Sequence, residues 1–207
     1  KFKKDKFIHL SSLGIEKALD SEYAKSKLNG EKKIIQNFKN SIIIKPSIVY
    51  SVDDKFTTNF MTLLSRLPIM PLYYGGRTKF SPIHVNDLTD IICSVIERDY
   101  YNLTVECIGP ETLSFKEILE HLLISINKKR LLIPLPYQIA SISAKILQLL
   151  PKPLLTEDQL KLLKYDNIKS GNYKTNFDLG LDANRKFKIE IDKYSYNWRS
   201  GGQFAKK

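Results

Sequence analysis

Three consecutive isoleucines, Ile42 to Ile44, are the sequence feature that most restricts the fold. They lie in the segment 41–50, SIIIKPSIVY, which is typical of a strand that Pro46 interrupts. A run of β-branched residues, with no polar residue at alternate positions, indicates a parallel strand that is buried on both faces. The segment therefore predicts a parallel sheet with helices packed against it.

The segments on either side alternate between strand and helix patterns, which agrees with such a sheet. We expect strands at 6–12, 41–50 and 105–108 and an extended piece at 80–85. Helices are expected at 21–38 and at 56–67, and two more are expected to begin after Asn86, as an N-cap, and after Ser114. Ser21 is the expected N-cap of the first helix, and Ser114 forms a capping box with Glu117. We predict an α/β fold: the C-terminal half of a Rossmann-type parallel sheet domain with a C-terminal helical cap.

Three clear parallel strands are few for such a sheet, because an open sheet with long exposed edges is prone to aggregate. Strands that would pair with the first one are not found among the 207 residues, and the first residue is Lys rather than Met. The nine glycines form no phosphate-binding fingerprint. We therefore expect the chain to be the back portion of a longer protein whose phosphate-binding turn precedes Lys1.

The pattern changes at Leu131, and we expect one unit at 1–130 and a second at 131–207. The segment 131–155 is strongly apolar and interrupted by prolines, which predicts a cap or docking segment with a helix at about 137–150. Thr156 with Gln159 forms a second capping box, which predicts another helix. The tail after Tyr173 is polar and shows little periodicity.

The net charge and the cysteines indicate which binding partners and which cellular compartment to expect. The net charge is +11, but the lysines are spread along the chain, so we predict no nucleic-acid binding and leave attraction to an anionic membrane surface or an acidic partner open. Cys93 and Cys107 lie in apolar stretches without metal-ligand spacing, which predicts reduced core residues, no metal site and a cytoplasmic location.

Tyr23 and Lys27 are four residues apart on one expected helix, so both side chains lie on the same face. A free phenol titrates near pH 10 and transfers protons poorly at neutral pH, whereas a nearby ammonium stabilises the phenolate. In isolation this spacing is also common on solvated helix faces. Ser11 and Ser12 precede the helix at a strand end, and Pro46 ends the next strand. Because ligands of such sheets bind beyond the carboxyl ends of the strands, these residues are expected in one crevice.

With these residues in place, the chain resembles the second half of an atypical extended short-chain dehydrogenase/reductase, a family that includes epimerases and dehydratases. The resemblance rests on HLSSLG, SEYAKSKLNG, SIIIKPSIVY, GGRTKFSPIHVNDL and LTEDQLKLL, and it covers residues 7–168. It is strongest with the group of NAD(P)-binding accessory subunits of respiratory complex I. The resemblance implies that the unit at 1–130 is part of an NAD(P)-binding domain.

The resemblance also implies roles for individual residues. Tyr23 and Lys27 correspond to the pair that lines the nicotinamide ribose and, in active members, performs catalysis. Ser11 corresponds to the strand-end serine near the cofactor, and Ser12 to the catalytic hydroxyl residue. Pro46, Ser47 and Ile48 correspond to the segment that faces the carboxamide of NAD(P)(H).

Other positions are less informative. His84 and Asp87 match a mostly structural motif, and His84 also fits a core histidine. Ser51 stands where the family usually has glycine.

Two functions remain open from the sequence. In the first, the protein is an accessory or assembly-type subunit related to NADH:ubiquinone oxidoreductase, with a mainly structural cofactor and with respiratory-complex subunits or the cytoplasmic face of the inner membrane as partners. In the second, it is an active NAD(P)-dependent oxidoreductase or epimerase/dehydratase that uses Ser12, Tyr23 and Lys27. Turnover of added NAD(P)H with a carbonyl substrate would distinguish the two functions.

Overall fold

The computed structural model of the chain describes residues 6–135 and 156–204. Its helices are α1 (Glu22–Asn37), α2 (Lys55–Arg66), α3 (Val85–Glu97), α4 (Phe115–Ser125), α6 (Glu157–Leu162) and α7 (Phe187–Asp192), with 3-10 turns at Tyr73–Gly76, Phe177–Leu179 and Ser195–Trp198. Its strands are β1 (Phe7–Leu10), β2 (Ser41–Pro46), β3 (Val49–Tyr50), β4 (Ile69–Leu72), β5 (Lys79–Phe80), β6 (Ile83–His84), β7 (Leu103–Cys107), β8 (Leu113–Ser114), β9 (Leu131–Pro134) and β10 (Lys174–Thr175).

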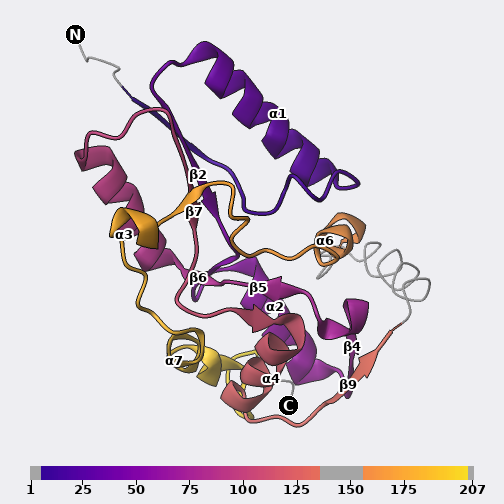
Figure 1. Ribbon diagram of the computed structural model, residues 1–207. Helices are drawn as coiled ribbons and strands as arrows, with labels where there is room; N and C mark the ends of the chain where they lie inside the picture. The colour runs from indigo at the N-terminus through magenta and orange to yellow at the C-terminus, as the bar shows by residue number, and fades with distance from the viewer. Residues whose placement is uncertain (1–5, 136–155, 205–207) are drawn as a thin grey trace.

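A four-stranded parallel sheet in the order β1-β2-β7-β10 forms the upper part of the molecule in Figure 1. All residues of β2 are buried, as the isoleucine run predicted. The strand stops at Pro46 because proline lacks the N–H that would continue the ladder, and the chain resumes as β3. The α/β fold with a parallel sheet is thereby confirmed.

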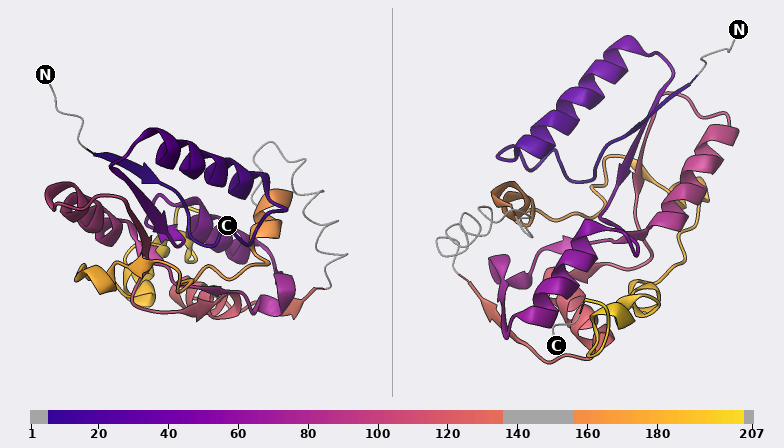
Figure 2. Two further views of the ribbon diagram at one scale, coloured as in Figure 1. Left: turned by 45° about the horizontal axis from the view of Figure 1, so that its top comes forward. Right: turned by 180° about the vertical axis from the view of Figure 1, so that it is seen from behind.

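Helices α1 and α3 cover the two faces of this sheet (Figure 2). Ile42 and Ile44 pack against Leu88, Ile91 and Val95 of α3. The face toward α1 is more polar, and Ala24 is the buried apolar residue of that helix. Ile35, near the end of α1, and Phe38, which follows it, are about half exposed.

The lower part of the molecule in Figure 1 is a second core, built around α2, α4 and α7. The capping box of Ser114 and Glu117 begins α4, as predicted. Aromatic rings interlock here: Phe60 meets Phe115 edge-on at 5.2 Å, and Tyr50 meets Phe187 at 4.9 Å. Two small sheets, β5-β8 and β4-β9, border this core, and β3-β6 connects it to the main sheet.

The start of α3 and the tail of the chain differ from what the sequence indicated. The N-cap of α3 is His84, whose Nδ1 accepts the Asn86 N–H at 3.2 Å, and not Asn86. The tail after Tyr173, which shows little periodicity in the sequence, is part of the fold: β10 completes the main sheet, and α7 and the turn after it enter the second core. The tail residues in that core are Phe187, Ile191, Tyr194 and Trp198, a helical spacing that polar neighbours had obscured.

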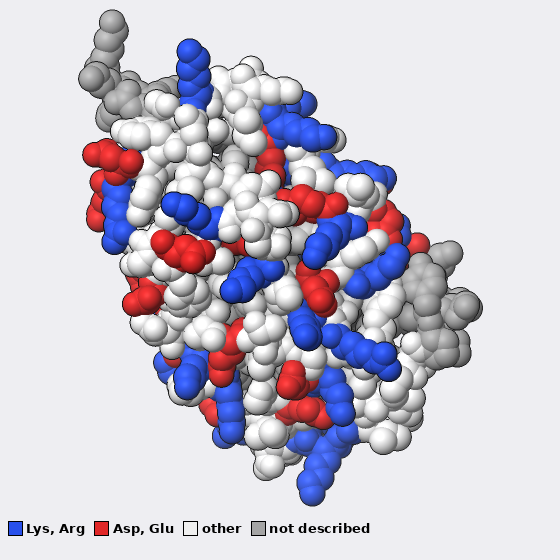
Figure 3. All heavy atoms as spheres, viewed as in Figure 1, with Lys and Arg blue, Asp and Glu red and all other residues white. Residues whose placement is uncertain are grey.

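The cysteines are both free, but only Cys107 is a core residue, whereas Cys93 is exposed on α3. The expectation of two core cysteines is therefore half correct. The helix expected at about 137–150 lies outside the described residues, as does most of the apolar segment 131–155. In the part of the chain that the structure describes, no helix has the length and apolar character needed to cross a bilayer. Over the face of the molecule shown in Figure 3, Lys and Arg side chains are interspersed with Asp and Glu. The capping box of Thr156 and Gln159 is present and begins α6.

Candidate functional site

A cavity of about 630 Å³ lies beyond the carboxyl ends of β1 and β2, between α1, α2 and α6. The volume is in the range that small-molecule ligands occupy. Every residue predicted for the site borders this cavity, and they are Ser11, Ser12, Tyr23, Lys27, Pro46, Ser47 and Ile48. The structure therefore brings these residues together at one end of a single cavity.

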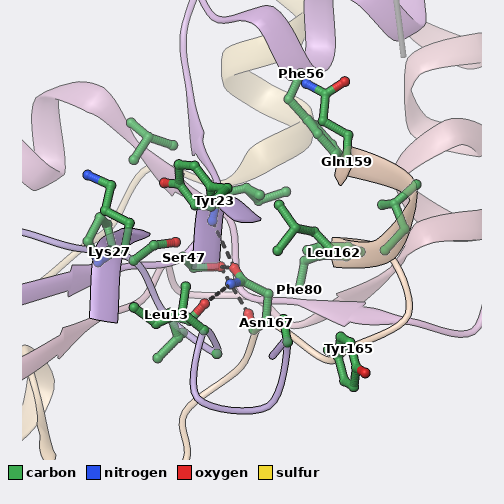
Figure 4. Close-up of a pocket in the computed structure, with 18 of the residues that line it drawn as sticks. Leu13, Tyr23, Lys27, Ser47, Phe56, Phe80, Gln159, Leu162, Tyr165 and Asn167 are labelled. Atoms are coloured by element: carbon green, nitrogen blue, oxygen red, sulfur yellow. Dashed lines mark hydrogen bonds between the residues drawn. The ribbon is translucent and has the colours of Figure 1, made fainter. Parts of the chain in front are cut away.

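Helix α1 positions Tyr23 and Lys27 on the pocket (Figure 4). Lys27 Nζ donates to the carbonyl of Leu10, the last residue of β1, at 3.1 Å. The same ammonium is 5.8 Å from the centroid of the Tyr23 ring, and Tyr23 is 43% exposed. The lysine is thus anchored to the strand end, while the phenol remains accessible to a ligand.

The two serines at the end of β1 differ in their surroundings. Ser11 is buried, and its hydroxyl donates to Glu31 of α1. Ser12 is half-buried at the pocket, one residue farther along. The Ser11 side chain therefore joins β1 to α1, and Ser12 is the better placed of the two to face a ligand.

Ion pairs of a buried lysine join α1 to the strand next to the site. Lys45 is 1% exposed, and its ammonium pairs with Glu31 at 3.0 Å and with Glu16. Burial alone would lower the pKa of Lys45, but hydrogen bonds to the two carboxylates outweigh it and raise the pKa. Because Glu31 also accepts from Ser11, this pair fixes α1 relative to the ends of β1 and β2.

His9 lies on β1 beneath α1, next to Gly30. A Cβ at Gly30 would be 3.5 Å from His9 Nε2, an ordinary contact, so the glycine permits close approach without being required for it. Burial lowers the pKa of His9, and the Lys27 ammonium adds to that shift. The neutral imidazole therefore contributes no positive charge beneath the helix at neutral pH.

Asn167 ties the strand ends together, and its side chain appears at the centre of Figure 4. Its Nδ2 donates to the Leu13 carbonyl at 2.6 Å, and its Oδ1 accepts from Ser47 Oγ at 2.6 Å and from the Ile48 N–H at 3.0 Å. The Ile48 N–H, which the family resemblance directs toward a carboxamide, is thus engaged within the protein. No local pattern in the sequence marks Asn167, because its partners lie about 120 or more residues away.

Asp158 of α6 joins the first turn of α1. Its carboxylate accepts from Ser21 Oγ at 2.9 Å, from the Glu22 N–H at 2.9 Å and from the Tyr23 N–H at 3.1 Å. A carboxylate at this position complements the positive end of the helix. The sequence reading found the helix that carries Asp158 but not this contact.

His84 and Asp87 lie away from the pocket, in agreement with a structural role. His84 caps α3, and Asp87 accepts the Arg185 backbone N–H at 3.0 Å and pairs with its guanidinium. Burial lowers the pKa of His84. Within residues 6–135 and 156–204, no group of three or more acidic, histidine or cysteine side chains is arranged to hold a metal ion.

No protein-family model matches the chain. Among curated proteins, it is 25% identical over 208 residues to "NADH dehydrogenase [ubiquinone] 1 alpha subcomplex subunit 9, mitochondrial" of Arabidopsis thaliana, which covers 95% of this chain and 52% of that protein. It is 26% identical over 200 residues to the "NADH-ubiquinone oxidoreductase 40 kDa subunit, mitochondrial" of Neurospora crassa, and this match covers 96% of this chain and 51% of that subunit. The chain spans about half the length of these curated relatives.

Among solved structures, the UDP-glucuronic acid 4-epimerase of Bacillus cereus, in complex with UDP-glucuronic acid and NAD, superposes with a TM-score of 0.61. The sequences are 17% identical, and the match covers 92% of this chain and 61% of the epimerase, so it establishes the fold. Over most of its length the chain is therefore homologous to subunits of mitochondrial NADH:ubiquinone oxidoreductase, and it has the Rossmann-like fold of the epimerase/dehydratase group.

Proposed function

We propose that the protein is an NAD(P)-binding accessory or assembly-type subunit of a respiratory NADH:quinone oxidoreductase, and that the cofactor has a mainly structural role. The single observation that carries the proposal is the position of Tyr23 and Lys27, on a pocket at the carboxyl ends of β1 and β2. Ligands of open parallel sheets bind at this edge. The homology to oxidoreductase subunits supports the accessory role.

The residues fit the nicotinamide half of a dinucleotide. Lys27, held by the Leu10 carbonyl, retains donors for a ribose, and the half-exposed Tyr23 and Ser12 add hydroxyls. Pro46 and Ser47 supply the adjacent wall. When bound, a nicotinamide cofactor supplies or accepts a hydride. The 207 residues contain no glycine-rich phosphate-binding fingerprint, so we propose that this chain by itself binds the dinucleotide weakly.

The second candidate is an active oxidoreductase or epimerase/dehydratase. It is favoured by one specific observation: Ser12, Tyr23 and Lys27 border the same cavity, and the phenol is accessible. In that function Tyr23 would exchange a proton with a substrate oxygen, Ser12 would hold that oxygen, and Lys27 would stabilise the phenolate. Ser11 would act through Glu31 as a positioning residue in either function.

The experiment that tests the proposal uses the full-length protein in its own membranes. We expect it to co-purify with the NADH:quinone oxidoreductase and to release bound NAD(P)(H) on denaturation. We also propose a peripheral position at the inner membrane, which carbonate extraction of the membranes would report. Recovery without cofactor and without other subunits would contradict the accessory role. Substrate-dependent consumption of NAD(P)H by the purified protein would establish the second candidate.

A further inference from the structure

The pocket has a second end that the cofactor-type residues do not occupy. Phe56 and Leu162 lie across the cavity from Lys27 in Figure 4, on α2 and α6 respectively. Both are half-buried side chains, and Phe56 meets Phe60 edge-on at 5.1 Å. Ile15 and Leu163 complete this wall. We call the region around Phe56 and Leu162 the distal end.

Several polar side chains near the distal end already have partners within the protein. In the capping box of α6, Thr156 Oγ1 accepts the Gln159 N–H at 3.2 Å and Gln159 Oε1 accepts the Thr156 N–H at 2.9 Å. Asp166 accepts the Lys79 N–H at 2.8 Å, and Asn167 is bonded to Leu13, Ser47 and Ile48. A ligand entering this end therefore meets mainly apolar surface.

Three helix N-termini border the pocket, and each is capped from within the chain. Asp158 accepts from the first turn of α1, and Asp54 accepts the Thr57 N–H of α2 at 2.5 Å. Thr156 caps α6. A free helix N-terminus would attract a phosphate, but two of these three carry a carboxylate that would repel one.

The charged side chains that line the cavity are also balanced. Lys27 and Lys55 contribute positive charge, and Asp158 and Asp166 contribute negative charge. Lys27 belongs to the cofactor end. A diphosphate at the distal end would therefore face no excess of cations, whereas diphosphate sites usually combine cations with free backbone N–H groups.

We propose that the distal end binds the apolar group of a small neutral carbonyl or alcohol compound, with its oxygen beside Ser12 and Tyr23, and not a nucleotide-sugar diphosphate. This ligand class differs from that of the solved epimerase, which holds UDP-glucuronic acid. The inference rests on the proposed function in one respect, namely that the Tyr23 end of the pocket belongs to a dinucleotide. Burial of the apolar group between Phe56 and Leu162 supplies the binding free energy.

Calorimetric titration of the full-length protein with octanol and, separately, with UDP-glucuronic acid tests the proposal. We expect saturable binding of octanol and weaker or undetectable binding of UDP-glucuronic acid. Leu162→Gln should weaken octanol binding about tenfold, the scale of losing much of one buried leucine contact. The matched control is Ile189→Gln on α7, where the isoleucine is exposed and does not border the pocket, and it should leave the affinity unchanged.

Phe56→Gln provides an independent measurement should Leu162→Gln fail to fold. The proposal is overturned if UDP-glucuronic acid binds more tightly than octanol. It is also overturned if a folded variant at Phe56 or Leu162 binds octanol with unchanged affinity. A separate NADPH titration of the same protein distinguishes failure of this inference from failure of the proposed cofactor role. NADPH binding without octanol binding refutes this inference alone, and octanol binding without NADPH binding refutes the proposed cofactor role.

Discussion

Asp158 and Tyr23 are 135 residues apart in the chain, yet the Asp158 carboxylate accepts the Tyr23 backbone N–H at 3.1 Å. The contact connects α6, which borders one side of the pocket, to the first turn of the helix that carries the phenol. Ser21 Oγ joins the same carboxylate at 2.9 Å. The position of Tyr23 therefore depends on a residue far along the chain.

Loss of this carboxylate should loosen both helices. Asp158→Ala leaves the Glu22 and Tyr23 N–H groups without their acceptor, so we expect the free energy of unfolding to fall by about 1–2 kcal/mol, the usual cost of losing a helix cap. Urea denaturation measures the change. Glu157→Ala in the same turn of α6 is the matched control and should be close to neutral. Equal stability of the two variants would contradict the role given to Asp158.

Stability should decline in alkali because of Lys45. Its pKa is raised in the folded protein: burial opposes the shift, but the hydrogen bonds to Glu16 and Glu31 outweigh it. The stabilisation from the ion pairs of Lys45 is complete below the pKa of lysine in the unfolded chain, about 10.4. It is lost as the pH rises from there through the pKa of Lys45 in the folded protein. Urea midpoints at rising pH test this. The Lys45→Met variant should lose less stability at alkaline pH than the unmodified protein. Lys25→Met, which removes an exposed surface ion pair, should lose as much stability as the unmodified protein.

The two cysteines should differ in their reactivity toward a thiol reagent. Cys107 is buried, which raises the pKa of its thiol to about 12, whereas Cys93 is exposed. Because the thiolate is the reactive form, an aromatic disulfide reagent should modify one thiol in the native protein and two in denaturant. Cys93→Ser should abolish the native reaction. Rapid modification of native Cys107 would show that the main sheet is not packed as described.

Tyr23→Phe distinguishes the two candidate functions. If the full-length protein is an enzyme, removing the phenol oxygen should lower turnover by about 10²-fold or more with little change in cofactor affinity. If it is an accessory subunit, respiratory NADH oxidation should be unaffected. Tyr196→Phe, at an exposed tyrosine outside the pocket, is the matched control. An active enzyme that tolerates Tyr23→Phe would remove Tyr23 from catalysis.

The sequence predicted those features that depend on neighbours in the chain. The isoleucine run predicted a buried strand, Ser21 and Ser114 predicted helix starts, and the spacing of Tyr23 and Lys27 predicted a shared face. These are local effects of propensity and periodicity, so a single segment contains the information.

The features that it missed depend on contacts between distant segments. The sequence did not reveal the contacts of Asn167 and Asp158, since their hydrogen-bond partners come from the segments just after β1 and β2 and from the start of α1. The helical spacing from Phe187 to Trp198 was overlooked because charged residues separate its apolar members. At the end of α1, Ile35 stays about half exposed, and Phe38 contacts the distant Phe7, with ring centroids 4.5 Å apart.

The most direct test of the dinucleotide site is NADPH titration of the full-length protein and two lysine variants. Lys27 borders the pocket and is anchored to the Leu10 carbonyl, whereas Lys25 faces outward and pairs with Glu22 at 2.7 Å. We predict that Lys27→Ala weakens NADPH binding about tenfold or more, the scale of losing a charge-assisted hydrogen bond, and that Lys25→Ala leaves the affinity within about twofold. Equal affinities for both variants, or no binding of NADPH by the folded full-length protein, would contradict the assignment of this pocket to a dinucleotide.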